Sequence, residues 1–208
     1  MKKILLIPLL LLISLSSASE SIDIFTSVYT GDSISVKKYI QAGGSLDIPN
    51  KKIPGASLLL TAIDNSRFEI VSLMMKENVP VKFREISHSI GRGEKEISLL
   101  LLSNTKSMTQ KEKDQLLNIA ASGSYEGYIK IIEELVKLGC NPTTIIYGEG
   151  LPNNSINSSF RVISNKYSKD AEIIFDYLVT VSQKILKTDK ETIIKKYVTD
   201  FNKGAEVL

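Results

Sequence analysis

The chain has 208 residues, of which 43% are hydrophobic and 24% are charged, so it is long enough for one domain with a sizeable core. The formal net charge is +3, but Lys2 and Lys3 stand in a segment that we expect to be removed. The remainder carries 24 basic and 23 acidic side chains, which gives no indication of a nucleic-acid partner. Cys140 is the only cysteine, and this excludes an intramolecular disulfide.

Residues 1–18 have the order of a secretory signal peptide. Lys2 and Lys3 precede an apolar run of ten residues from Ile4 to Ile13, and small residues follow at Ser16-Ser17-Ala18. This run is about half of the roughly twenty residues that a membrane span needs, and no cysteine follows it that could carry a lipid anchor. We therefore expect a protein of the bacterial periplasm without a stable membrane anchor, with secretion as the alternative.

Behind this segment, apolar pairs recur four residues apart, as on consecutive turns of one helix face. These paired segments begin at residues 35, 70, 97, 131 and 173. A shorter apolar segment precedes each one, at 24–28, 58–63, 86–90, 116–121 and 160–163. Turn residues follow the first four, at 42–44, 77–80, 103–105 and 138–142. The pattern predicts an all-α chain built from two-helix units.

Two stretches, 105–114 and 143–159, interrupt this pattern, and we expect both to be irregular. The second contains the triplets Asn153-Asn154-Ser155 and Asn157-Ser158-Ser159, which we interpret as part of a polar loop. A last helix is expected over residues 187–201.

Several segments carry a recognisable motif. Gly31-Asp32 stands ahead of Val-Lys-Lys-Tyr-Ile-Gln-Ala-Gly at 36–43, and Gly-Ala-Ser-Leu-Leu-Leu-Thr-Ala at 55–62 stands ahead of Phe-Glu-Ile-Val at 68–71. Residues 117–123 and 138–142 repeat the two halves. These segments resemble the Gly-Asp, Val-Lys-x-Leu-Leu-x-x-Gly and Gly-Thr-Pro-Leu-His-x-Ala motifs of ankyrin repeats. The third unit lacks the Thr-Pro-Leu-His start and the fifth has no glycine, so a generic helical-hairpin solenoid is the alternative.

The resemblance implies an ankyrin-like helical-hairpin repeat solenoid of about four to five units over residues 22–180, with a capping helix and tail over 181–208. Such arrays bind other proteins along an extended surface made of the first helices and the connecting fingers. We expect partner contacts from the fingers and from the turns within units. The candidate residues are Asp47, Asn50, Lys51, Lys52, Arg67, Lys82, Arg84, Arg92, Tyr147 and Glu149.

Basic residues dominate the early fingers, so an acidic partner surface is expected, although ordinary solubilising charges are an equal alternative.

His88 is the only histidine, and its neighbours Ser87 and Ser89 do not face it on a helix. We expect His88 to be a hydrogen-bonding side chain and Cys140 to pack as a small one. One histidine and one cysteine far apart do not form a metal site. We therefore expect no enzyme, no cofactor and no metal.

Export, a binding scaffold and the lack of catalytic motifs favour an immunity or inhibitor protein that neutralises a toxic effector enzyme such as a phospholipase. Small exported ankyrin-like proteins encoded beside secreted lipases resemble this chain. The alternatives are a stress-protective periplasmic protein associated with antioxidant defence and an effector secreted toward a host.

Overall fold

The computed structural model describes residues 23–49, 56–123, 126–146, 153–165 and 169–199. The expected signal peptide, residues 1–18, lies outside the described residues. Within the described ranges the regular elements are helical, and β-structure is limited to isolated bridges between Pro49 and Ser57 and between Ile146 and Asn153. The prediction of an all-α chain is confirmed for this part of the sequence.

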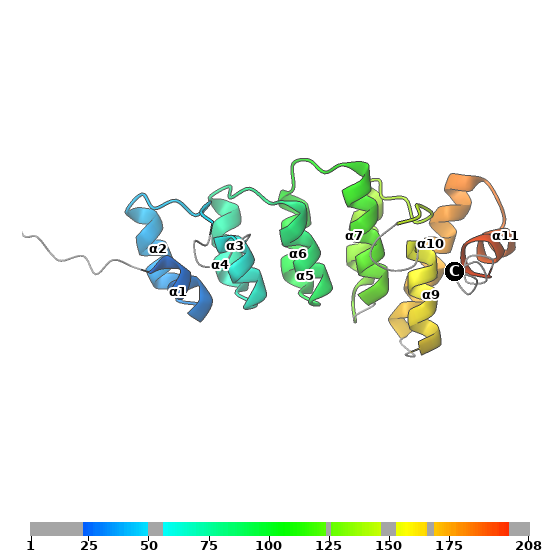
Figure 1. The fold of residues 1–208 in the computed structure, drawn as a ribbon, viewed down its shortest axis with the longest axis horizontal. Helices are drawn as coiled ribbons and strands as arrows, with labels where there is room; N and C mark the ends of the chain where they lie inside the picture. Colours follow the sequence, from blue (N-terminus) through cyan, green and yellow to red (C-terminus); the bar gives the residue numbers. More distant parts are fainter. Residues whose placement is uncertain (1–22, 50–55, 124–125, 147–152, 166–168, 200–208) are drawn as a thin grey trace, which may run out of the picture.

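The helices form pairs that follow one another in a row (Figure 1). The first helices of the pairs are α1 (Ile24–Thr30), α3 (Leu58–Asp64), α5 (Phe83–Gly91), α7 (Gln110–Gly123) and α9 (Ser155–Asn165). The second helices are α2 (Ser33–Gln41), α4 (Phe68–Lys76), α6 (Lys95–Asn104), α8 (Ile129–Lys137) and α10 (Lys169–Leu186). First helices contact the first helices of adjacent pairs, and second helices contact second helices. The described helices therefore make two layers.

The core lies between these layers and runs along the whole row. Fully buried side chains occur on successive first helices, as with Ile63, Ile90 and Leu117, and on successive second helices, as with Met74 and Leu101. All belong to one continuous apolar cluster. Burying each such side chain contributes about 1.5–3 kcal/mol, and much of that burial comes from the neighbouring pair.

The two stretches expected to be irregular are shorter than predicted, because α7 begins at Gln110 and α9 at Ser155. Glu112 accepts hydrogen bonds from the backbone N–H and hydroxyl of Thr109, and the Thr109 hydroxyl accepts from the Glu112 N–H. This reciprocal capping box starts α7 early. Asn154 similarly accepts from the Asn157 N–H at 2.9 Å and caps α9. The interpretation of residues 155–159 as loop was wrong.

The helices of the C-terminal part begin and end at other residues than expected. Helix α10 continues past residue 180 to Leu186, and Lys187 then adopts a positive φ of 52°. The helix expected from 187 begins later, as α11 (Lys190–Ile194) continued by the π-helical turn η1 (Lys195–Thr199). Asp189 caps α11 by accepting from the Thr192 N–H at 2.8 Å. Three side chains pack inward from this segment: Ile193, Tyr197 and Val198.

Side chains from one pair bind the carboxyl end of the preceding first helix, and we name these the helix-end contacts. Arg67 donates from Nε and Nη2 to the Tyr29 carbonyl at 3.1 and 2.9 Å. Arg92 donates to the Asp64 carbonyl at 2.9 Å, and the Tyr128 hydroxyl donates to the Ile90 carbonyl. The last carbonyls of a helix have no partner within it and carry partial negative charge. The helix-end contacts therefore provide hydrogen-bond donors for carbonyls at the carboxyl ends of α1, α3 and α5. They also join neighbouring pairs.

Gly31 makes room for the first of these contacts. It has a φ of +87°, which ends α1 in the left-handed region that favours glycine. A Cβ at this position would lie 3.2 Å from both Cδ and Nε of Arg67. The glycine of the Gly31-Asp32 motif thus has two roles. It forms the turn that ends α1, and it leaves space for Arg67 of the neighbouring pair.

We predict that Arg67→Ala lowers the free energy of unfolding by about 1 kcal/mol, because the Tyr29 carbonyl loses two charge-assisted donors at a partly exposed site. Chemical denaturation followed by circular dichroism measures the change. Lys130→Ala, at an exposed position of α8, is the matched control and should stay within about 0.5 kcal/mol of the parent. Equal stability of the two variants would contradict a structural role for Arg67.

Candidate functional site

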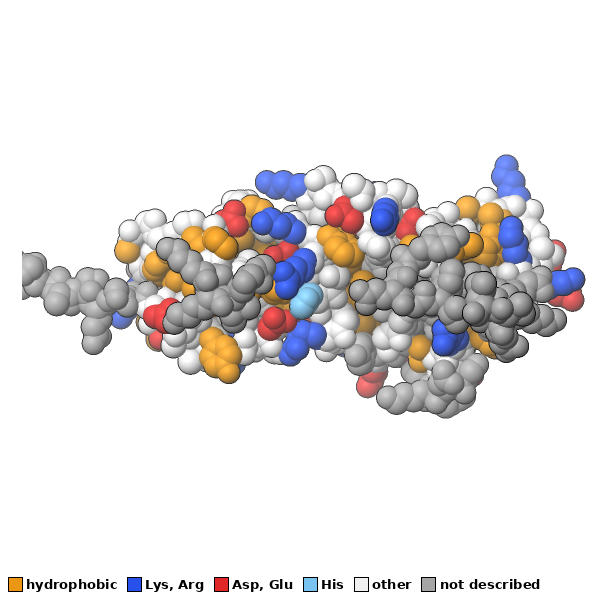
Figure 2. Space-filling model, viewed as in Figure 1, with side chains coloured by type: hydrophobic (Ala, Val, Ile, Leu, Met, Phe, Trp, Pro, Cys, Tyr) orange, Lys and Arg blue, Asp and Glu red, His pale blue; other side chains and the backbone are white. Residues whose placement is uncertain are grey.

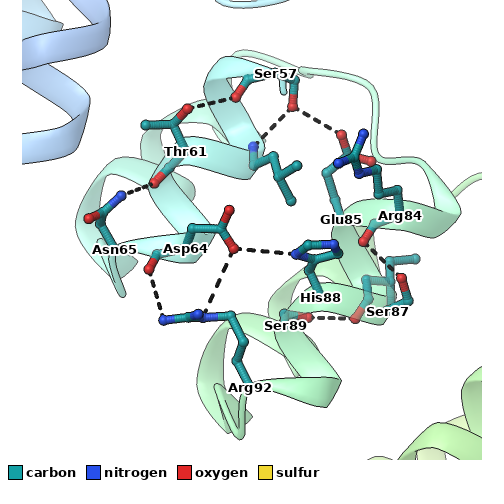
Figure 3. A network of polar contacts seen from close by, with 12 residues as sticks. Ser57, Thr61, Asp64, Asn65, Arg84, Glu85, Ser87, His88, Ser89 and Arg92 are labelled. Atoms are coloured by element: carbon teal, nitrogen blue, oxygen red, sulfur yellow. Dashed lines mark hydrogen bonds and ion pairs between the residues drawn. The ribbon is translucent and has the colours of Figure 1, made fainter. Parts of the chain in front are cut away.

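Polar side chains line the facing sides of α3 and α5. Ser57, Thr61 and Asp64 follow one another at helical spacing along α3 and its N-terminal cap, and Glu85, His88 and Arg92 do so along α5 and its C-terminal cap. Figure 3 shows these residues arranged across the space between the two helices. We call this set of six residues the α3–α5 polar cluster.

Ser57 connects the two helices at one end of the cluster. Its Oγ accepts from the Leu60 N–H at 3.0 Å, which caps α3, and donates to Oε1 of Glu85, also at 3.0 Å. A serine hydroxyl can donate and accept at the same time, so one side chain starts the helix and holds the next pair. Glu85 itself is buried.

Asp64 occupies the other end of the cluster. Nδ1 of His88 lies 3.3 Å from Oδ1 of Asp64, and Arg92 binds the Asp64 backbone carbonyl. A carboxylate only accepts, so Nδ1 carries the proton in this pair and Nε2 of a neutral imidazole is an acceptor. The side chains of His88 and Asp64 are 41% and 40% exposed. This end of the cluster is therefore open to a partner.

The contacts between the second and third pairs repeat at one sequence offset. Ser57 with Glu85, Asp64 with Arg92, and Ser66 with Glu94 are each separated by 28 residues. The two pairs therefore keep one register from end to end. Such a recurrence of polar residues at matched positions is the sequence signal that could have identified the cluster.

The structure does not gather the predicted binding residues at one place. Asp47 is exposed in the connection from α2 to α3, and Lys82 is exposed at the start of α5. Arg84 lies in the first turn of α5 and not in a finger, which corrects the expected position. The remaining finger residues lie outside the described residues: Asn50, Lys51, Lys52, Tyr147 and Glu149.

Arg67 and Arg92 lie between the helices of their units, as predicted. They stand at the opposite ends of the helices from Asp47 and Lys82, next to the short turns (Figure 1). Their guanidinium groups are engaged in the helix-end contacts. The sequence shows the two arginines but not the backbone carbonyls that lie beside them in the fold. The role of the two arginines in joining neighbouring pairs was therefore missed.

His88 has no serine nucleophile beside it among the contacts of the described residues. The hydroxyl of Ser87 donates to the Arg84 carbonyl at 2.9 Å, and that of Ser89 donates to the Ile86 carbonyl at 2.8 Å. Both serines thus bond to their own helix. In the described ranges, no group of three or more His, Cys, Asp or Glu side chains is placed to hold a metal ion. The space-filling view shows the single histidine at the surface among charged side chains (Figure 2).

Cys140 is buried beside the start of the connection from α8 to α9. Burial, together with the negative charge of Asp114, raises the pKa of its thiol to about 12. Asp114 accepts from the Asn141 N–H, the Thr144 hydroxyl and the Gln110 amide at 2.6, 2.8 and 2.9 Å. The prediction that Cys140 packs as a small side chain is confirmed, and its protonated thiol is a poor nucleophile at neutral pH.

We predict that the parent protein loses stability above about pH 9 and that Cys140→Ala removes part of this loss. The unfolded thiol ionises near its ordinary pKa of about 8.5, whereas the folded thiol keeps its proton to about pH 12. The unfolded state then binds fewer protons, so stability falls by up to about 1.4 kcal/mol per pH unit. Unfolding free energies of both proteins from pH 8 to 11 measure the difference. Parallel curves would contradict the raised pKa.

No protein-family model matches this chain, and no curated protein matches it. Among the described helices, none combines the length and the apolar character that crossing a bilayer requires.

Proposed function

We propose that the chain is an exported, ankyrin-like repeat protein that binds another protein without catalysing a reaction. The observation that carries the proposal is the exposed end of the α3–α5 polar cluster, formed by Asp64 and His88 on adjacent first helices. Polar side chains presented by rigid neighbouring helices recognise a partner with little loss of conformational freedom. The row of helical pairs supports the assignment because it resembles the arrangement expected of an ankyrin-like solenoid.

The partner that we propose is a toxic effector enzyme, such as a phospholipase, which this protein neutralises as an immunity protein. The signal-peptide pattern of residues 1–18 would bring it to the periplasm, where such an effector acts. The balanced charge of the mature chain favours a protein partner over nucleic acid. A protein that blocks by binding needs no catalytic group of its own.

The product of the neighbouring gene, expressed in the periplasm with and without this protein, tests the proposal. We predict that the neighbour alone arrests growth, that co-expression restores it, and that the two proteins co-purify. If the neighbour is harmless alone, or remains toxic in the presence of this protein, the immunity function is wrong.

We further predict that Asp64→Ala combined with His88→Ala weakens partner affinity by tenfold or more, which is about 1.4 kcal/mol. Both side chains are partly exposed, so the folded state should persist, as circular dichroism can verify. Lys130→Ala on α8 serves as the control because it lies on a second helix. Calorimetric titration with the co-purified partner measures the affinities. Equal affinity of the double variant and the control would place the interface elsewhere.

A further inference from the structure

Three large apolar side chains are exposed at the short turns of the first two pairs. Tyr29 near the end of α1 is 60% exposed, Ile34 in the first turn of α2 is 66% exposed, and Phe68 at the start of α4 is 48% exposed. Single exposed apolar side chains are normal on a protein surface, whereas a group of them marks a contact surface. We therefore asked whether these three lie together.

Arg67 connects the end of α1 to the start of α4. Its Nε and Nη2 bind the Tyr29 carbonyl at 3.1 and 2.9 Å. Its Cζ lies 3.3 Å from the position that a Cβ of Gly31 would take, so the guanidinium packs closely on the turn of the first pair. Phe68 directly follows Arg67 in the chain. The residues that carry the Tyr29 and Phe68 side chains are therefore neighbours.

An ion pair connects the starts of α2 and α4. Nζ of Lys37, one turn after Ile34, lies 3.3 Å from Oε1 of Glu69, and Glu69 directly follows Phe68. Figure 2 shows a hydrophobic side chain that protrudes at this lower edge of the molecule, below and to the left of the histidine. We name this set the short-turn surface, and its members are Tyr29, Ile34, Arg67 and Phe68.

The guanidinium of Arg67 forms no ion pair with a carboxylate of the described residues. Of the other charged groups nearby, Lys37 and Glu69 pair with each other. Asp32 caps α2 by accepting from a backbone N–H of its first turn at 3.0 Å, and the partial positive charge of a helix N-terminus offsets that of a carboxylate. Arg67 donates to a neutral carbonyl, and its Nη1 has no acceptor within the described ranges.

We propose that the short-turn surface docks a segment of the partner protein in which a carboxylate stands between apolar side chains. The carboxylate binds Nη1 of Arg67, because an arginine bonds more strongly to a carboxylate than to a neutral group. The apolar side chains cover Tyr29, Ile34 and Phe68. Tyrosine and arginine are enriched among the side chains that dominate the binding energy of protein interfaces. One cation beside balanced charges attracts an anionic bilayer or a nucleic acid only weakly.

The short-turn surface adjoins the part of the interface that Asp64 and His88 form. Asp64 ends α3, and residues 65–67 lead from it to Phe68. Nδ1 of His88 lies 3.3 Å from Oδ1 of Asp64. The inference rests on the proposed function, because it adds an apolar anchor and a carboxylate of the partner to the polar contacts of Asp64 and His88.

The test uses the peptide acetyl-Leu-Asp-Leu-amide as the probe, titrated into isotope-labelled protein at constant ionic strength so that screening does not change. Amide chemical shifts report where the probe binds. Acetyl-Leu-Asn-Leu-amide, which has the same shape without the charge, is the comparison ligand. The variants are Ile34→Ser and Phe68→Ser, whose exposed side chains the fold does not need. Ile173→Ser on α10, at an isoleucine that is 45% exposed, is the matched control.

We expect saturable shifts for amides near Gly31 and Arg67, and binding at least about tenfold weaker for Ile34→Ser, for Phe68→Ser and for the asparagine peptide. Ile173→Ser should bind as the parent does. Shifts that stay linear, or that are equal in Phe68→Ser and the parent, overturn the docking surface. Equal binding of the asparagine peptide overturns the assignment to a carboxylate.

Light scattering of the protein alone distinguishes a partner protein from a second copy of this chain. We expect a monomer. A dimer that Ile34→Ser dissociates and Ile173→Ser does not would assign the short-turn surface to a second copy and overturn the proposal.

The result is separable from the proposed function. If the neighbouring gene product is neutralised but binds Phe68→Ser as tightly as the parent, only the short-turn surface is wrong. If the aspartate peptide binds there while the neighbouring gene product is harmless, the immunity function fails and the docking surface stands.

Discussion

A two-helix unit of this chain cannot bury its own apolar surface, and each unit therefore depends on the next. Ile63 and Ile90 on successive first helices have no exposed surface, although each helix has only a few turns. The same interfaces hold the helix-end contacts made by Arg67, Arg92 and Tyr128. Apolar burial supplies most of the free energy, while the helix-end contacts satisfy carbonyls that would otherwise lack partners.

This dependence between neighbours also determines the candidate site. The α3–α5 polar cluster exists because the second and third pairs are in one register, with Ser57 bound to Glu85 at one end and Asp64 bound to Arg92 at the other. A shift of one helix along the other would separate His88 from Asp64. Packing and recognition therefore share the same interface, and Arg92 belongs to both.

The sequence alone predicted much of the fold because apolar side chains recur at helical spacing in every pair. The starts of α7 and α9 were missed, since polar runs were interpreted as loops although Thr109 with Glu112 and Asn154 with Asn157 carry capping patterns. The site was less predictable. A basic residue in a turn suggests a partner contact, and nothing local to Arg67 shows that the Tyr29 carbonyl lies beside it. Glu85 was passed over because a glutamate in a helix is usually exposed.

A row of helical pairs that contact mainly their neighbours must be elongated. Small-angle X-ray scattering of the protein in solution measures this directly through the distribution of distances between atom pairs. The structure predicts a skewed distribution with a long tail, as an extended stack gives. A symmetric distribution, as a compact globule of the same mass gives, would contradict the stacked arrangement and the first-helix surface that depends on it.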